Sequence, residues 1–160
     1  MQLNPCAKHK LIRDSVRTFA ETELAPVASA IDRAATFPRD IIEKMRPLNY
    51  FGLQVPREFG GAALDSVSAA IVVEEISRVC AAIGLCVTVH NGVAVYPFLQ
   101  FANAEQKRQY LPKLADGELI GAFSLTEANA GSDSASVETT AVKRNNAYVL
   151  NGTKIFVTNG

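Results

Sequence analysis

Apolar residues recur at the three- and four-residue spacing of amphipathic helices through most of the first 117 residues. Near the start of the chain, one such stripe has charged residues between its members: Leu11, Ile12, Val16, Phe19 and Ala20. The pattern predicts a helix that continues or restarts through Pro26 to about Arg33, since proline is tolerated in a first helical turn. The segment PRDIIEKM, residues 38–45, predicts a short second helix.

A third helix is expected after Asp65, whose carboxylate can accept hydrogen bonds from first-turn amides. Its charged residues Glu74, Glu75 and Arg78 are expected to lie towards solvent or a partner. Its apolar residues are expected to face inward: Val67, Ala70, Ile71, Val73 and Ile76. A later helix is predicted to begin at Ala104 and to end at Asp116 and Gly117.

Residues 79–104 contain no Asp, Glu, Lys or Arg, which prompts the question of a membrane span. The longest strictly apolar run, residues 79–87, is far shorter than the roughly 20 residues that a spanning helix needs. Polar residues such as His90, Asn91 and Gln100 interrupt the rest. We therefore expect a helix buried on most sides within a helical domain, and no membrane span.

The pattern changes after Gly117, because Thr, Val and Ile supply 11 of the 43 residues that follow. Phe123 and Leu125 alternate with polar neighbours as in a strand. Asn145-Asn146 offers one turn, and Asn151-Gly152 between YVL and TKIFV predicts a hairpin with a tight type I′ turn. About three strands leave an unfinished sheet with unprotected edges, so the chain is expected to be part of a longer protein.

The predicted fold is therefore α+β. An all-α helical domain over residues 1–117 precedes the first antiparallel strands of a β-barrel-like domain over residues 118–160. Sixteen basic and sixteen acidic residues cancel, so charge gives no reason to expect nucleic acid or an anionic membrane as a partner. Three cysteines without CxxC spacing favour reduced thiols, and the amino terminus has no secretory signal.

The residues alone support little catalytic chemistry. GxSxG, GxGxxG and the P-loop pattern are absent, and Cys86 with His90 supplies only two potential ligands, so no metal site is expected. The segment SLTEANAGSDSAS, residues 124–136, leaves two interpretations open. Backbone amides around Gly131 and Ser132 suit a phosphate held without lysine, but the segment also fits an ordinary polar loop.

The same segment resembles the first signature of the acyl-CoA dehydrogenases. The match covers the following positions: Leu125, Thr126, Glu127, Ala130, Gly131, Ser132, Asp133 and Ser136. Ser124 and Ala128 depart from it, since the family usually places Gly, Ala or Cys at the first and often proline at the second. The resemblance extends along nearly the whole chain, through FGLQVPREFGGAALD, FANAEQKRQYLPKLADGE and NGTKIFVTNG in the family's order.

The resemblance implies FAD as cofactor and oxidation of an acyl-CoA thioester to a trans-2-enoyl thioester. It implies two flavin-contacting segments, the first comprising Phe123, Ser124, Leu125, Thr126, Gly131 and Ser132, and the second Phe156, Val157 and Thr158. Ser132 would also lie near the thioester ligand. Val89, His90, Asn91 and Ala94 would line the acyl pocket, although apolar helix residues are more often plain core.

By the same resemblance, the catalytic glutamate is expected beyond Gly160, so this chain would carry no catalytic residue and be inactive alone. Glu127 and Asp133 are expected to serve in capping and turn formation. The resemblance also implies an electron-transfer flavoprotein as the electron acceptor and a homotetramer as the assembly. The compartment that it implies is the bacterial cytoplasm or the mitochondrial matrix. A non-catalytic truncated helical module that mediates an interaction or binds acyl-CoA, an acyl-CoA oxidase and a related flavin monooxygenase remain alternatives.

Overall fold

Residues 6–160 are described by the structure, a computed structural model. An N-terminal α-helix, α1 (Ala7–Phe19), runs through a π-helical turn (Ala20–Leu24) directly into α2 (Ala25–Ala34). Pro26 lies in the first turn of α2, as the sequence predicts. The remaining helices are α3 (Arg39–Met45), α4 (Ser66–Val79), α5 (Ala81–Thr88), α6 (Tyr96–Phe101) and α7 (Ala104–Asp116).

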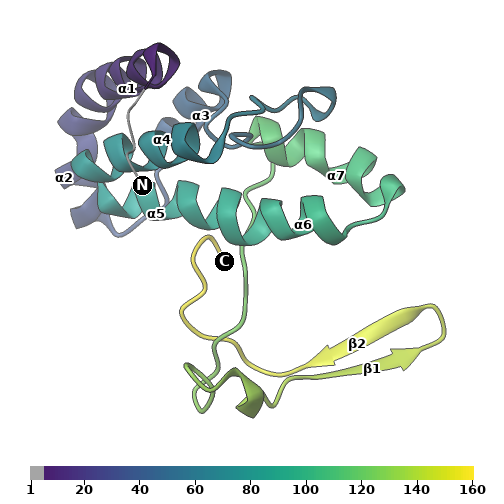
Figure 1. The fold of residues 1–160 in the computed structure, drawn as a ribbon. Helices are drawn as coiled ribbons and strands as arrows, with labels where there is room; N and C mark the ends of the chain where they lie inside the picture. Colours follow the sequence, from purple (N-terminus) through teal and green to yellow (C-terminus); the bar gives the residue numbers. More distant parts are fainter. Residues whose placement is uncertain (1–5) are drawn as a thin grey trace.

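The helices form one body in which α4 packs between α1 and α5, while α6 lies beside α7 (Figure 1). A π-helical segment (Val89–Val95) joins α5 to α6 without a break. Most buried apolar side chains form one core, whose fully buried members include Leu24, Met45, Phe51, Ile76 and Val87. A smaller core of Val55, Val95, Leu111 and Ala115 lies between α7 and the π-helical segment.

The helix ends follow from local chemistry. Asp65 caps α4 by accepting a hydrogen bond from the Ser68 amide at 2.8 Å, which confirms the prediction from sequence. Asn103 and Gln106 form a reciprocal capping box at the start of α7. That helix ends at Asp116 because Gly117 adopts a left-handed conformation with φ of 81°, which glycine tolerates.

The predicted inner face of α4 is partly wrong. Val67 and Ala70 are exposed, and Glu75, expected towards solvent or a partner, is buried. The buried positions are Ser68, Ile71, Val72, Glu75 and Ile76, which follow helical spacing closely. Two polar residues belong to the stripe because Ser68 bonds the capping Asp65 and Glu75 meets arginines of α1, so hydrophobicity alone selected a neighbouring face.

Gly84 of α5 lies against Ser77 of α4. A Cβ atom there would lie 2.8 Å from the Ser77 Cβ atom. We expect Gly84→Ala to lower the free energy of unfolding by about 1–3 kcal/mol, because the helices would have to separate. Gly92→Ala is the matched control, since no atom lies within 4 Å of its added Cβ and alanine favours helix by about 0.5–1 kcal/mol.

The measurement is guanidinium unfolding of both variants, followed by circular dichroism. Equal midpoints for Gly84→Ala and Gly92→Ala would contradict the close approach of α4 and α5.

The helical run Ala81–Phe101 has 21 residues and a mean hydropathy of 1.5, so length and composition alone would let it cross a membrane. A single helix of this kind is weak evidence, because core helices of soluble proteins share these properties. Midway along it, the side chains of His90 and Asn91 hydrogen-bond to backbone groups of other segments. The absence of a membrane span stays a prediction.

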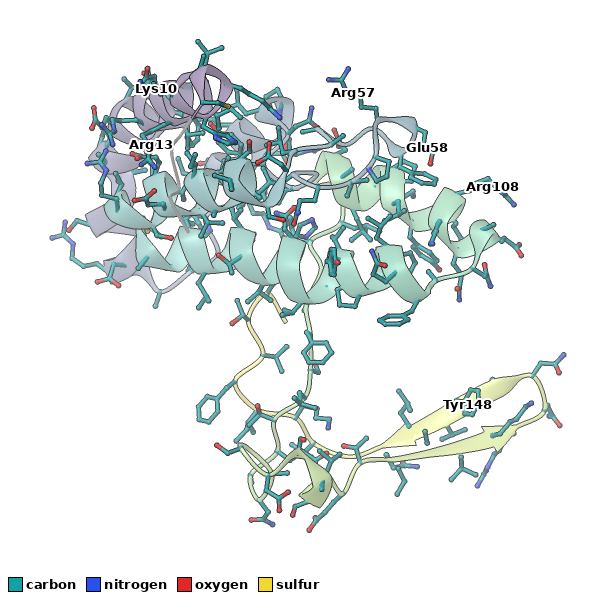
Figure 2. The ribbon with its side chains drawn as sticks, in the orientation of Figure 1. Lys10, Arg13, Arg57, Glu58, Arg108 and Tyr148 are labelled. Atoms are coloured by element: carbon teal, nitrogen blue, oxygen red, sulfur yellow. The ribbon has the colours of Figure 1, made fainter. Side chains whose placement is uncertain are left out.

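An antiparallel hairpin of β1 (Thr140–Arg144) and β2 (Ala147–Asn151) extends away from the helices (Figure 1). Val142 pairs with Val149, and every residue of both strands is exposed, including Tyr148 (Figure 2). The predicted α+β order of a helical part followed by antiparallel strands is confirmed. The boundary between residues 117 and 118 as a domain boundary stays a prediction.

Two predictions about this tail are wrong. The hairpin turns at Asn145-Asn146, where Asn145 has φ of 56°, and not at Asn151-Gly152. Gly152 instead lets the chain pass close to Thr139, whose Cβ would be 2.7 Å from an added Cβ at Gly152. Phe123 and Leu125 lie in extended chain outside any strand, because within residues 6–160 no neighbouring strand pairs with them.

Candidate functional site

The two segments predicted to contact a ligand lie side by side, although they are far apart in sequence. The Ile155 amide donates to the Thr126 carbonyl at 2.9 Å, and the Lys154 ammonium donates to the Leu125 carbonyl at the same distance. The Asn159 amide group donates to the carbonyls of Gly121 and Cys86 at 3.2 and 3.1 Å. Residues 121–127 and 154–159 therefore form a joined pair of segments, anchored to α5.

Apolar side chains stand exposed on both segments. Phe123 is 49% exposed, Leu125 43% and Phe156 89%. Phe156 also has φ of 55°, a left-handed conformation that costs a bulky residue free energy and is found most often at functional sites. Val157 and Thr158 are half-buried beside it. Together these segments present exposed apolar side chains of the kind that can cover part of a planar ligand.

The loop at Gly131 and Ser132 is open and polar. No atom lies within 4 Å of the position of a Cβ on Gly131, and Ser132 is exposed. Within residues 6–160, the amides of Gly131 and Ser132 donate to no other backbone group. Asp133 shapes the turn by accepting hydrogen bonds from the Ala135 amide at 3.2 Å and the Ser136 hydroxyl at 2.6 Å. Its expected role in turn formation is confirmed, and the free amides suit an anionic group.

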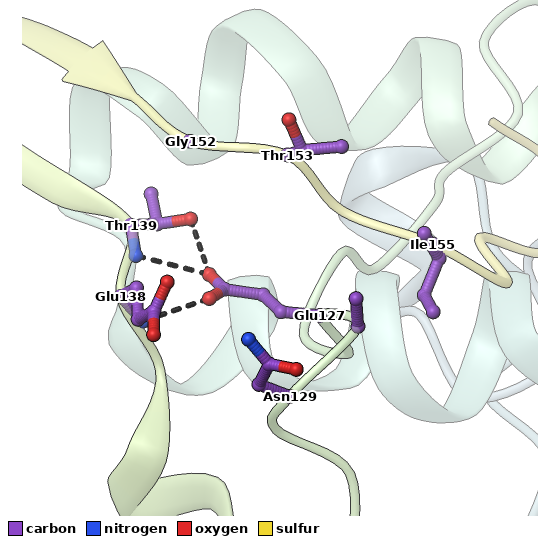
Figure 3. Close-up of a pocket in the computed structure, with 8 residues that line it drawn as sticks. Glu127, Asn129, Glu138, Thr139, Gly152, Thr153 and Ile155 are labelled. Atoms are coloured by element: carbon purple, nitrogen blue, oxygen red, sulfur yellow. Dashed lines mark hydrogen bonds between the residues drawn. The ribbon is translucent and has the colours of Figure 1, made fainter.

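Glu127 lies in a pocket of about 330 Å³ between the first segment and the base of the hairpin (Figure 3). Its side chain is 8% exposed and accepts hydrogen bonds from the amides of Glu138 at 2.7 Å and Thr139 at 3.0 Å, and from the Thr139 hydroxyl. Lys154 donates to it at 2.7 Å. Lys154 above all, then Thr139 and Glu138, lower the pKa of Glu127 to about 2.

Sequence reasoning assigned Glu127 to capping and turn formation, but missed Lys154 and Thr139 as its partners. These partners lie 27 and 12 positions further along the chain. An acidic residue and a lysine on separate segments are too common for their pairing to be read from one sequence. The bridge between Glu127 and Ala130 that tightens the turn is local and does agree with the expectation.

His90 is fully buried, and both of its ring nitrogens are occupied. Nε2 lies 3.0 Å from the Phe51 carbonyl and 3.1 Å from the Leu114 carbonyl, while Nδ1 accepts from the Gly121 amide at 2.8 Å. This arrangement assigns the proton to Nε2. Burial lowers the pKa of His90 to about 4, so the imidazole is neutral near pH 7. It connects the helical body to the start of the tail.

Asn91 is similarly engaged. Its side chain accepts from the Leu53 amide at 3.1 Å and donates to the carbonyls of Tyr50 and Val87, each at 3.0 Å. Val89 and Ala94 are half-buried on the same π-helical segment, and Ala94 lies close to Gly121. The predicted lining of an acyl pocket by these four residues stays a prediction.

Among residues 6–160, the structure brings no three His, Cys, Asp or Glu side chains together as potential metal ligands. Cys86 is buried and burial raises the pKa of its thiol to about 11, so it is a poor ligand or nucleophile near pH 7.

Family comparisons match nearly the whole chain. Residues 7–118 match the sequence model described as acyl-CoA dehydrogenase, N-terminal domain, and residues 122–160 match that of the acyl-CoA dehydrogenase middle domain. An acyl-CoA dehydrogenase of Bacillus subtilis is 47% identical over 150 residues, which cover 94% of this chain and 40% of the relative. A short-chain specific acyl-CoA dehydrogenase of Clostridium acetobutylicum is 42% identical over all 160 residues, or 42% of its own length.

The mitochondrial short-chain specific acyl-CoA dehydrogenase of Mus musculus is 41% identical over 151 residues, covering 94% of this chain and 37% of that protein. A structure from work on the electron transferring flavoprotein of Acidaminococcus fermentans matches with a TM-score of 0.94 and 39% identity, covering 100% of this chain and 42% of that one. An acyl-CoA dehydrogenase of Bacillus anthracis complexed with FAD matches with a TM-score of 0.89 and 35% identity over 96% of this chain and 27% of that one. The chain therefore spans about two fifths of the length of the curated relatives.

Proposed function

Because the chain belongs to the acyl-CoA dehydrogenase family, we propose that it forms the amino-terminal helical domain and the start of the middle domain of an FAD-dependent acyl-CoA dehydrogenase. The proposed boundary lies between residues 117 and 118. The proposed reaction removes hydrogen from the Cα–Cβ bond of an acyl-CoA thioester and gives the trans-2-enoyl-CoA. The names of the relatives support a short-chain acyl group as the first substrate to test.

The single observation that best supports this proposal is the joining of residues 121–127 to residues 154–159. It brings Leu125, Thr126 and Phe156 together on one partly exposed surface. Such a surface fits FAD, since exposed apolar side chains can cover the planar ring and the free amides at Gly131 and Ser132 can take the pyrophosphate. When bound, FAD would accept the hydride from the β-carbon.

The proposed roles of the chain's residues follow from their positions. Phe156, Val157 and Phe123 would cover the ring and exclude water, Ser124 would stand beside them, and the hydroxyls of Thr126 and Thr158 would bond its polar edge. Ser132 would lie near the thioester, while Val89, His90, Asn91 and Ala94 would form the wall of the helical domain. His90 would act there by holding the backbone of Phe51 and Gly121 through its ring nitrogens, since its imidazole is buried.

Glu127 is not proposed as the catalytic base. Its carboxylate accepts three hydrogen bonds from Glu138 and Thr139 and a fourth from the Lys154 ammonium, and its pKa of about 2 makes it a weak proton acceptor. We propose that the residues described here bind and orient FAD and thioester, and that the base comes from elsewhere in the full-length enzyme. An electron-transfer flavoprotein is the proposed electron acceptor. The proposed assembly is a homotetramer, and the proposed compartment is the bacterial cytoplasm or the mitochondrial matrix.

The experiment is anaerobic addition of butyryl-CoA to the protein of the complete reading frame, with flavin absorbance followed near its visible maximum. We expect bleaching of the flavin and reduction of a dye acceptor, whereas the 160-residue chain alone should give no turnover. Hydrogen peroxide formation with oxygen as efficient acceptor would favour an oxidase. Failure to bind FAD would contradict the proposal and favour a non-catalytic helical module.

A further inference from the structure

The side chains of Glu127 and Lys154 join the two segments that would face the flavin. The Lys154 ammonium donates to the Glu127 carboxylate at 2.7 Å and to the Leu125 carbonyl at 2.9 Å. The pair lies next to the backbone bond from the Ile155 amide to the Thr126 carbonyl at 2.9 Å. One lysine therefore bonds both the side chain and the main chain of the opposite segment.

Glu127 also fixes a third piece of chain. Its carboxylate accepts from the amides of Glu138 and Thr139, which immediately precede β1 (Figure 3). Neither Glu127 nor Lys154 is freely exposed, since their side chains are 8% and 21% exposed. Charge-assisted hydrogen bonds at such partly buried positions are stronger and more directional than those between neutral groups.

Apart from the Asn159 bond to the Gly121 carbonyl at 3.2 Å, few other contacts hold these segments in register. The apolar side chains of Leu125 and Phe156 are exposed and supply no shared core. Every residue of the hairpin that continues from them is exposed as well. Near Thr126 and Phe156 the links are the Lys154 bonds and the Ile155 bond, since the Asn159 bond joins the segments further away, at Gly121. Loss of one charge would leave the other partly buried without its partner.

We propose that Glu127 and Lys154 are a positioning pair, which sets the register between residues 124–127 and 154–158 and thereby the affinity for FAD. The choice of FAD as the ligand rests on the function proposed above, whereas the claim that the pair sets the register does not. The pair acts through the backbone of Leu125, Thr126 and Ile155, and takes no part in proton or hydride transfer.

The test uses the full-length protein with Glu127→Gln, Lys154→Met and Lys154→Arg. Hydrogen exchange of the Ile155 amide is measured without FAD, and the dissociation constant for FAD is measured by quenching of flavin fluorescence. For Glu127→Gln and Lys154→Met we expect the exchange rate of the Ile155 amide and the dissociation constant for FAD each to rise about tenfold or more. Lys154→Arg should largely restore both, because it keeps the charge.

Matched controls are Glu138→Gln, whose carboxylate makes no hydrogen bond within residues 6–160, and Lys143→Met on the exposed hairpin. Both should leave Ile155 exchange and FAD affinity at wild-type values. The urea midpoint of the helical signal should also be unchanged in Glu127→Gln, since the helices have their own core. A general loss of folding in both Glu127→Gln and Lys154→Met would assign the pair to stability and overturn the positioning role.

Unchanged Ile155 exchange in both variants would overturn the proposal. Faster exchange of the Ile155 amide with unchanged FAD affinity would overturn the second part of the proposal, since the register would then not determine FAD binding. If the wild-type protein does not bind FAD, both the proposed function and the claimed link between register and FAD affinity fail. The claim about the register is still tested separately, because hydrogen exchange of the Ile155 amide is measured without FAD.

Discussion

Replacing Glu75 by alanine should lower the free energy of unfolding by about 3–5 kcal/mol, the cost of breaking a buried ion-pair network. Glu75 is 1% exposed on α4 and contacts Arg13 of α1 at 2.6 Å. Arg17 donates two bonds to it, at 2.8 and 2.9 Å, and Arg78 lies 3.4 Å away. The substitution leaves a gap at a buried position and removes the carboxylate that the three arginines share, although Arg13 keeps Glu74 and Arg78 keeps Glu21.

Glu74→Ala is the matched control, because it removes the adjacent carboxylate, which is 61% exposed and, within residues 6–160, pairs only with Arg13. An exposed pair of this kind contributes at most about 1 kcal/mol. Denaturant unfolding of both variants at pH 7 gives the comparison. Equal losses for Glu74→Ala and Glu75→Ala would show that burial of the carboxylate does not matter.

The Glu75 network also predicts acid sensitivity. Arg17, followed by Arg13, lowers the pKa of Glu75 from 4.5 to about 2. A carboxylate with a depressed pKa stabilises the fold fully above its unfolded pKa, and this contribution is lost as pH falls from about 4.5 through about 2. We therefore expect Glu75→Gln to be less stable than wild type at pH 7, with a difference that shrinks towards pH 2.

The second large effect concerns His90. Burial lowers its pKa from 6.5 to about 4, so between these values the unfolded chain binds a proton that the folded chain does not. Stability from this group is complete above pH 6.5 and falls as pH drops through about 4. The shift corresponds to about 3 kcal/mol, at 1.36 kcal/mol for each pKa unit.

The experiment compares unfolding free energies at several pH values between 7 and 4 for wild type, His90→Gln and His9→Gln. His90→Gln should be less stable at pH 7, because the carbonyls of Phe51 and Leu114 lose a shared donor, but should lack most of the pH dependence. His9→Gln should keep the wild-type slope because it keeps His90. The same slope in all three proteins would contradict the assignment to His90.

Local signals predicted much of the fold. Asp65 and Gly117 mark helix ends where the sequence placed them, and the change in composition after Gly117 coincides with the end of the helical body. Each depends on groups within a few residues of one another. The candidate ligand segments were instead indicated by the resemblance of residues 124–136 and 151–160 to the acyl-CoA dehydrogenases.

Other features depended on distant segments. Hydrophobicity placed Val67 inside and Glu75 outside, because the arginines that bury Glu75 lie 58 and 62 residues earlier in the chain. The Asn151-Gly152 pair has the chemistry of a tight turn, but the packing of Gly152 against Thr139 keeps that stretch extended.

The sequence by itself determined the helices, their caps and the α+β order, because these depend on local propensity and contiguous pattern. The two segments of the candidate site were indicated by the resemblance to the acyl-CoA dehydrogenases and stay a prediction. Only the tertiary structure decided that Glu75 is buried, that His90 links three segments, and that Glu127 meets Lys154. The physical reason is that a polar side chain is stable in a buried place only when its partners come from elsewhere in the fold.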